Sequence, residues 1–307
     1  MIIIVIIIGM KILHHYIAIV LLMLAVVLPI SACGTTKPTT TINVVASINT
    51  WGAIAEEIGG SAVHVTSLIS DPNVDPHLFQ SSVSTALAIS QAKVIVENGL
   101  GYDSFMSKLV AANGSSSQIV LVAAHLMGIS GTTANPHLWY DLTKVSIVAA
   151  ALTSTFSHLL PAKASYFAAN DRAFTAALKT DFVALHALAI SANHAPIAYT
   201  ERVAGYLLAE AGLTNRTPEG FAIAIENGTP PDIADTIAMQ NLITSHQIRA
   251  LVYNDQTISP VTTSIRNLAV ANHIPVVPVS ETMPPPYSTF PAWQLATIRK
   301  LQSALKS

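Results

Sequence analysis

The amino-acid sequence predicts an α/β protein with two pseudo-symmetric lobes, each containing a largely parallel sheet, joined by one long rigid helix. Three observations predict this class. Strand-like and helix-like segments alternate over residues 42–123, and the same alternation resumes over residues 197–305. Between them, residues 162–191 contain no Gly or Pro and are rich in Ala and Leu, which is typical of an uninterrupted helix.

In the first lobe, short apolar or alternating runs predict strands, and longer apolar segments bounded by turn residues predict helices. Residues 42–47 form a buried opening strand, and the helix over residues 51–58 ends at Gly59-Gly60. A loop rich in Asp, Pro and Asn follows the second strand and carries His77. The remaining predicted elements are strands over residues 63–69, 94–96 and 118–123 and a helix over 83–91.

The connecting helix begins at Pro161, a residue suited to the first turn of a helix. At 1.5 Å per residue it would be about 45 Å long. The second lobe is predicted to contain strands over residues 197–200, 250–253 and 275–279 and helices over 203–210, 261–271 and 292–305. The chain then divides into a signal peptide (1–33), a tether (34–41), an N-terminal lobe (42–160), the connecting helix (161–191) and a C-terminal lobe (192–307).

Composition excludes several classes of protein. Hydrophobic residues make up 51% of the chain and the net charge is -2, which argues against disorder. We find no apolar run of about 18 residues after Cys33, which argues against a multi-span membrane protein. The 15 basic and 17 acidic residues include no basic cluster, so nucleic acid is not an expected partner. One cysteine excludes a disulfide framework and a cysteine-rich zinc module.

The N-terminus has the pattern of a secretory signal. Lys11, His14 and His15 precede a nearly continuous apolar run over residues 16–30, and the start is cleaner from Met10 than from Met1. The run ends in Ile30-Ser31-Ala32-Cys33, which resembles a bacterial lipobox with Cys33 as the lipidated residue. The alternative is an uncleaved signal-anchor helix. We therefore expect a protein outside the cytoplasm, attached to the membrane by a lipid on Cys33.

Two Pro-His pairs lie in polar loops of the first lobe, at Asp75-Pro76-His77 and Asn135-Pro136-His137. The imidazole nitrogen is a good ligand for zinc, manganese and similar ions. A single loop histidine is more often a surface residue, but two in matching contexts favour a metal site.

The sequence resembles the metal-binding receptors of bacterial zinc/manganese ABC importers, the cluster A-I solute-binding proteins. Three segments carry the resemblance, in this order after the lipobox. They are the DPH-x-aromatic segment at residues 75–79, the segment AKVIVENGLGY at 92–102, and the NPH-x-W-x-D segment at 135–141.

The resemblance implies two metal ligands from each lobe. His77 and His137 are implied for the first lobe. In the second, Glu201 stands where zinc-preferring members often have His, although a carboxylate there can also simply favour a helix N-terminus. Glu281 follows the last strand where Asp is commoner, and Asp255 is the runner-up for this fourth ligand.

The resemblance implies a non-enzymatic, monomeric receptor that captures one divalent transition metal ion, zinc or manganese, and delivers it to an ABC permease. The long helix would act as a stiff spine and keep lobe closure small. A secreted, membrane-anchored metallohydrolase is the alternative. Neither an HExxH helix nor a Gly-x-Ser-x-Gly elbow is present in the sequence to support it.

Overall fold

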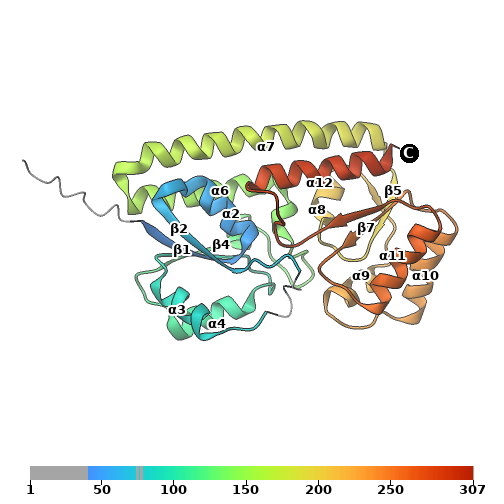
Figure 1. Cartoon of the computed structure of the whole chain (residues 1–307), viewed down its shortest axis with the longest axis horizontal. Coiled ribbons are helices and arrows are strands. Elements are labelled where there is room, and N and C mark those ends of the chain that lie inside the picture. Colours follow the sequence, from blue (N-terminus) through green and yellow to red (C-terminus); the bar gives the residue numbers. More distant parts are fainter. Residues whose placement is uncertain (1–40, 74–75, 77–78, 307) are drawn as a thin grey trace, which may run out of the picture. The chain divides into compact units, whose positions relative to one another are not determined.

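The computed structural model describes residues 41–73, 76 and 79–306 (Figure 1). The predicted signal peptide, with Met10 and Cys33, lies outside these residues. So do residues 34–40 of the predicted tether and His77.

Two parallel four-stranded sheets form the centres of the two lobes. The first has the order β2-β1-β3-β4, and the second has the order β6-β5-β7-β8. The strands of the first sheet are β1 (Ile42–Ile48), β2 (Val63–Ile69), β3 (Val94–Glu97) and β4 (Ile119–Val122). Those of the second are β5 (Pro196–Tyr199), β6 (Thr214–Asn215), β7 (Ala250–Asn254) and β8 (Val276–Val279). The repeated order confirms the predicted pair of α/β lobes, while the predicted lobe boundaries stay a prediction.

The helices of the first lobe are partly as predicted. Helix α3 (Val83–Gln91) matches its predicted bounds, and a capping box between Ser82 and Thr85 fixes its start. Sequence reasoning missed α4 (Ser104–Asn113), α5 (Ala123–Leu126) and α6 (Leu142–Leu159). The other elements are α2 (Asn49–Gly59) and the short 3-10 helices η1 (Gly60–Ala62), η3 (Leu138–Tyr140) and η4 (Pro161–Lys163).

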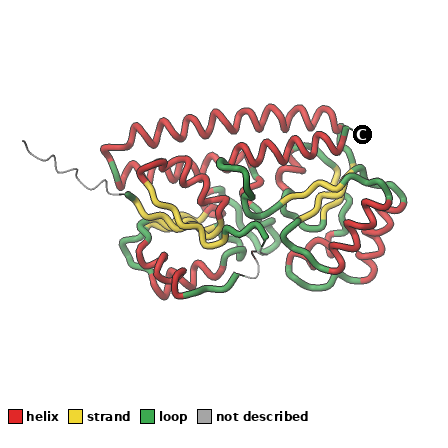
Figure 2. The backbone as a smooth tube through the Cα atoms, viewed as in Figure 1, coloured by secondary structure: helices red, strands yellow, loops and turns green. Residues whose placement is uncertain are grey.

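Helix α7 (Ala164–Ala192) links the lobes, as predicted. Its buried residues recur every three, four or seven positions, which marks one packed face. They are Phe167, Phe174, Leu178, Asp181, Leu185, Leu188 and Ala192. This face packs against α2, α6 and α12 (Phe290–Leu305), and α7 runs along the same side of both sheets (Figure 2).

By length and composition alone, the helical stretch Pro161–Ala192 is apolar enough to cross a membrane, the one such helix among the described residues. The stretch contains Asp171, Arg172, Lys179 and Asp181, so it is not a continuous apolar run of the kind we looked for after Cys33, and a single such helix does not contradict the argument against a multi-span membrane protein. An Ala- and Leu-rich helix with few charges passes this test even where, as here, one face packs on neighbouring helices.

The remaining helices, all in the second lobe, are α8 (Gly205–Glu210), α9 (Glu219–Glu226), α10 (Ile233–Thr244) and α11 (Pro260–Ala271).

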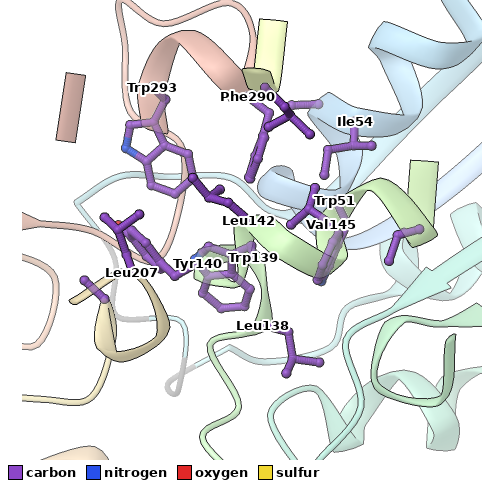
Figure 3. Close-up of a cluster of buried hydrophobic side chains, with 14 of the residues drawn as sticks. Trp51, Ile54, Leu138, Trp139, Tyr140, Leu142, Val145, Leu207, Phe290 and Trp293 are labelled. Carbon is purple, nitrogen blue, oxygen red and sulfur yellow. The ribbon is translucent and has the colours of Figure 1, made fainter. Parts of the chain in front are cut away.

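A continuous hydrophobic core joins the lobes and supports the loop that carries His137. Trp139 and Tyr140 in η3 are fully buried. The Trp139 ring packs edge-on to Trp51 of α2, and the Tyr140 ring lies 5.6 Å from that of Trp293 in α12 (Figure 3). The residues immediately after His137 are thereby fixed against elements of both lobes.

Candidate metal centre

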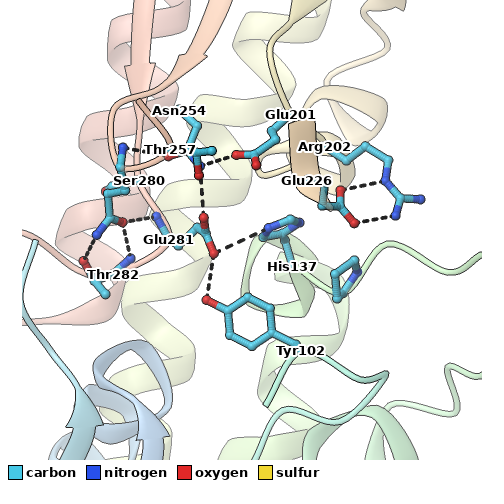
Figure 4. A network of polar contacts seen from close by, with 12 residues as sticks. Tyr102, His137, Glu201, Arg202, Glu226, Asn254, Thr257, Ser280, Glu281 and Thr282 are labelled. Carbon is cyan, nitrogen blue, oxygen red and sulfur yellow. Dashed lines mark hydrogen bonds and ion pairs between the residues drawn. The ribbon is translucent and has the colours of Figure 1, made fainter. Parts of the chain in front are cut away.

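Three side chains at or just after the ends of strands β5, β7 and β8 meet at the carboxyl edge of the second sheet (Figure 4). Tyr199 of β5 pairs with Val252 of β7, so continuing this register by two residues places Glu201 level with Asn254. Asn254 in turn pairs with Val279 of β8, two residues before Glu281. Strand order reverses between β5 and β7, which is where parallel α/β sheets bind ligands.

Glu281 is fully buried and held from several directions. Its backbone N–H donates to Oε1 of Gln256 at 2.6 Å. Its carboxylate accepts from Nδ2 of Asn254 at 3.0 Å and, from the first lobe, from the hydroxyl of Tyr102 at 2.8 Å. The Glu281 carboxylate therefore lies at the junction of the two lobes.

Glu201 is 1% exposed and shares a donor with Glu281. The Asn254 side-chain amide donates to Oε2 of Glu201 as well as to Oε1 of Glu281. The other oxygen of Glu201, Oε1, has no hydrogen-bond partner among the described residues. Because a buried carboxylate oxygen without a donor is costly, this atom is a candidate for a cation.

His137 enters the cluster from the first lobe. Its ring is fully buried, and Nε2 lies 3.7 Å from Oε2 of Glu281. The Nδ1 atom lies 2.8 Å from Oδ1 of Asn135, which fits an N–H donor at Nδ1 and directs Nε2 at the cluster. Within the described part of the chain, Nε2 has no hydrogen-bond partner. A ligand-oriented imidazole has this arrangement.

The Asn98-Gly99 pair holds the His137 loop in place. The Asn98 amide donates to the backbone oxygen of Pro136 at 2.9 Å and accepts from the indole N–H of Trp51 at 3.1 Å. Gly99 has a φ of +86°, and a Cβ there would lie 2.9 Å from Val122, so this tight turn requires glycine. Asn98 and Gly99 of the 92–102 segment thus position the loop that carries His137.

Buried negative charge dominates the electrostatics. Burial by itself lowers the pKa of His137, but the Glu281 carboxylate, with smaller contributions from Glu226 and Glu201, outweighs it and raises that pKa. Burial, and then the charge of Glu281, raises the pKa of Glu201 well above its usual range, against the opposing hydrogen bond from Asn254. The cluster therefore holds protons tightly unless another cation neutralises it.

An ion pair closes one side of the cluster. Arg202 donates to both oxygens of Glu226, at 2.9 and 2.6 Å, and its Nη1 donates to the backbone oxygen of Thr133 in the first lobe at 3.0 Å. A cavity of about 310 Å³ adjoins this pair and is also lined by Tyr102 and Pro136. Tyr102, one of its lining residues, also donates its hydroxyl to Glu281 of the cluster.

The structure brings His137 and Glu281 together, and Asn254 links Glu201 to Glu281. Asp255, the runner-up, has an exposed side chain near Lys300, whereas its neighbour Asn254 lies in the cluster. Among the described residues, which exclude His77, no group of three or more His, Cys, Asp or Glu side chains is placed to hold a metal ion.

Sequence reasoning missed three residues that orient the cluster: Asn254, Gln256 and Tyr102. Tyr102 lies inside the quoted 92–102 segment, and Asn254 and Gln256 flank Asp255. Their closeness in sequence to a family motif or to a candidate ligand was the one feature that could have pointed to them.

Comparisons with known proteins show the family of this chain. The family model described as zinc-uptake complex component A, periplasmic (ZnuA), matches residues 44–304. The manganese-binding lipoprotein MntA of Bacillus subtilis is 28% identical over 139 residues, which cover 43% of this chain and 45% of that protein. The zinc-binding protein TroA of Treponema pallidum is 25% identical over 189 residues, covering 58% of this chain and 61% of that protein.

The fold has the same relatives. The solved structure of the periplasmic zinc-binding protein TroA of Treponema pallidum matches with a TM-score of 0.74 at 19% identity, covering 87% of this chain and all 100% of that one. At this identity the likeness shows the fold, and the family model, which spans most of both lobes, shows the family. The chain belongs to the ZnuA family, that of the periplasmic component A of zinc-uptake complexes.

Proposed function

We propose that this chain is an extracytoplasmic receptor that binds one divalent transition metal ion, zinc or manganese, and delivers it to the permease of an ABC importer. Membership of the ZnuA family supports this function. So do the names of two relatives, one manganese-binding and one zinc-binding. A lipid on Cys33 would keep the receptor, a monomer, at the membrane surface.

The proposed ligands are His77, His137, Glu201 and Glu281. One observation carries the assignment: two carboxylates that are 1% and 0% exposed share a single amide donor beside a fully buried imidazole. Two buried like charges are strongly unfavourable without a counter-charge. Because the amide of Asn254 is neutral, it cannot supply that charge, whereas a divalent cation can.

The ligand chemistry favours binding over catalysis. Imidazole nitrogen and carboxylate oxygen are donors that zinc and manganese both accept. Four protein donors would close the site, and a hydrolytic metal site needs one position open for water. We therefore propose a non-catalytic role.

A competition titration tests the capture function. The full chain, purified in detergent and stripped of metal with a chelator, is titrated with zinc and with manganese against a chromogenic chelator. We expect one tightly bound ion per chain, and a loss of affinity of at least about 100-fold for His77→Ala, His137→Ala or Glu281→Gln. His64→Ala, at an exposed strand position, and Asp255→Asn are the matched controls.

Two results would count against the assignment. No tight ion in the wild-type chain would remove the receptor function, and equal effects of His64→Ala and His137→Ala would remove the ligand set. Delivery is tested separately in cells that depend on this chain for metal. His137→Ala should lower their accumulation of the cognate ion, while His64→Ala should not.

A further inference from the structure

The half-buried side chain of Asn135 contacts both lobes. In the first lobe, its Oδ1 accepts from the backbone N–H of His137 at 3.1 Å and lies 2.8 Å from Nδ1 of the His137 ring. Across the junction, its Nδ2 donates to the backbone oxygen of Arg202 at 2.7 Å. Because Arg202 directly follows Glu201, these hydrogen bonds, the Asn135 bridge, join the ring of one proposed ligand to the backbone beside another.

The surroundings of the Asn135 amide determine its orientation at both ends. A flipped amide would direct its NH₂ at the backbone N–H of His137 and its oxygen at the carbonyl oxygen of Arg202. Donor would then face donor, and acceptor would face acceptor. The observed orientation also fits a neutral His137 that carries its proton on Nδ1, which leaves Nε2 as the ligand atom.

The second lobe leaves space for this amide at Gly205, the first residue of α8. Outside its own helix and chain neighbours, a Cβ on Gly205 would meet one described atom within 4 Å, which is Nδ2 of Asn135 at 2.8 Å. The φ of Gly205 is not in the left-handed region, so the backbone itself does not require glycine. The close approach of Asn135 is therefore what the missing side chain permits.

We propose that Asn135 is a positioning residue that fixes His137 of the first lobe relative to Glu201 of the second before an ion arrives. The inference rests on the proposed receptor function. Ordering ligands at the moment of binding costs free energy, and ligands that are already held in place do not incur this cost. Loss of the Asn135 bridge should therefore lower metal affinity, although Asn135 itself is not a proposed ligand.

The first test measures zinc affinity of the metal-stripped full chain by competition with a chromogenic chelator. Asn135→Ala removes both ends of the bridge and should weaken zinc binding about 10- to 100-fold, the effect typical of residues that orient metal ligands. Gly205→Ala removes no hydrogen-bonding group, but its added methyl group displaces the Asn135 amide. We expect a loss of similar size from this variant.

Combining the two variants separates the bridge from two independent effects. In Asn135→Ala the atom that the new methyl group would meet is gone, so adding Gly205→Ala should cause no further loss of affinity. Independent effects would instead multiply. Asn170→Ala is the matched control, because Asn170 also donates its amide to a backbone oxygen, that of Ile58, but lies on α7. Its affinity should equal that of the wild-type chain.

A second measurement reports on the His137 ring itself. In the zinc-loaded chain, the Nδ1 proton of this fully buried ring should give a downfield proton NMR signal that exchanges slowly with water. The signal is identified by its loss in His137→Ala. In zinc-loaded Gly205→Ala the ring remains, but the proton should exchange faster because its acceptor has moved. A side chain that only stabilised the fold would lower the free energy of unfolding and leave this signal unchanged.

The outcomes separate the two proposals. A wild-type chain that binds no ion overturns both the receptor function and the role of Asn135. If the wild-type chain binds one ion, three results would each overturn the Asn135 bridge alone. They are an unchanged affinity in Asn135→Ala or Gly205→Ala, losses that multiply in the double variant, and an unchanged His137 proton signal in Gly205→Ala.

Discussion

Metal affinity should fall steeply as the pH is lowered from about 7.5 to 5.5, because protons compete for the proposed ligands. Only the neutral imidazole of His137 and the ionised carboxylate of Glu201 can bind the ion. In the metal-free chain the pKa of each group is raised, that of His137 by Glu281 against the effect of burial, and that of Glu201 by burial. Each group therefore keeps its proton to a higher pH than usual, and the loss of affinity begins nearer neutrality than an ordinary histidine would place it.

The magnitude follows from the number of protons displaced. Below its raised pKa, each group lowers the association constant about tenfold per pH unit, or about 1.4 kcal/mol. Across two pH units the loss is about 100-fold if one proton is displaced and about 10,000-fold if both are.

Isothermal titration calorimetry in two buffers of different ionisation enthalpy measures the affinity and the number of protons released. His137→Ala and Glu201→Gln should each lower the proton count by about one, whereas His64→Ala should leave it unchanged. A flat affinity across this range, with no proton release, would refute the reasoning for both groups.

Three further changes test a buried carboxyl group in α7 and two residues beside the site. Asp181 in α7 is 1% exposed, and burial raises its pKa from 3.8 to about 7. Ionising this buried carboxyl group is therefore unfavourable, and the free energy of unfolding of the wild-type chain falls as the pH rises through that value. Asp181→Asn should therefore be more stable than wild type by up to about 4 kcal/mol at about pH 8 and nearly equal to it at about pH 4, measured by urea unfolding. Arg202→Ala leaves the carboxylate of Glu226 without its bidentate partner and should cost about 2 kcal/mol in the same assay, with little rescue by Arg202→Lys. Gln256→Ala removes the acceptor that holds the backbone of Glu281 and should weaken metal binding about tenfold in the competition titration, although Gln256 is not a proposed ligand.

Every strand except β6 was predicted from sequence, because the others are short apolar or alternating runs. β6 (Thr214–Asn215) consists of two exposed polar residues and gives no such signal. Helix α6 could also have been found: its buried positions Leu142, Val145, Ala149, Leu152 and Phe156 recur at three- and four-residue spacing. Helix α10 gives no such signal. It buries only Met239 and Ile243, and its remaining isoleucines at 233 and 237 are exposed, so no apolar face is visible in its sequence.

The site shows a similar division. The resemblance to the receptor family pointed to His137, Glu201 and Glu281, because it implies ligands at fixed positions relative to the family's motifs and strands. The choice between Asp255 and its neighbour depends on strand geometry, since successive side chains point in opposite directions. Asn254 points into the cluster and Asp255 points out, and this phase is set by the pairing of β7 with β5 and β8. The contact of Tyr102 with Glu281 depends on how the two lobes meet, which no local pattern encodes.

The contacts between the lobes constrain how an ion leaves the site. Besides the bond from Tyr102 to Glu281, the hydroxyl of Tyr140 donates to the backbone oxygen of Ser280 at 2.8 Å. Asn49 exchanges two 2.9 Å hydrogen bonds with the backbone of Met283. All of these bonds from the first lobe fall on residues 280–283, whereas α7 packs against α2 and α6 of the first lobe and against α12, which resists a wide hinge motion.

We therefore expect release to begin with a local displacement of residues 280–283, which would carry Glu281 away from His137. Amide hydrogen exchange should report this motion as faster exchange over residues 280–289 in the metal-free chain than in the loaded one, with α7 unchanged. Equal protection of residues 280–289 in both states, with exchange changing along α7 instead, would contradict it. Glu281 accepts a hydrogen bond from Tyr102 of the first lobe and lies beside His137, so a displacement of its segment would separate the lobes and remove a ligand from the ion in one step.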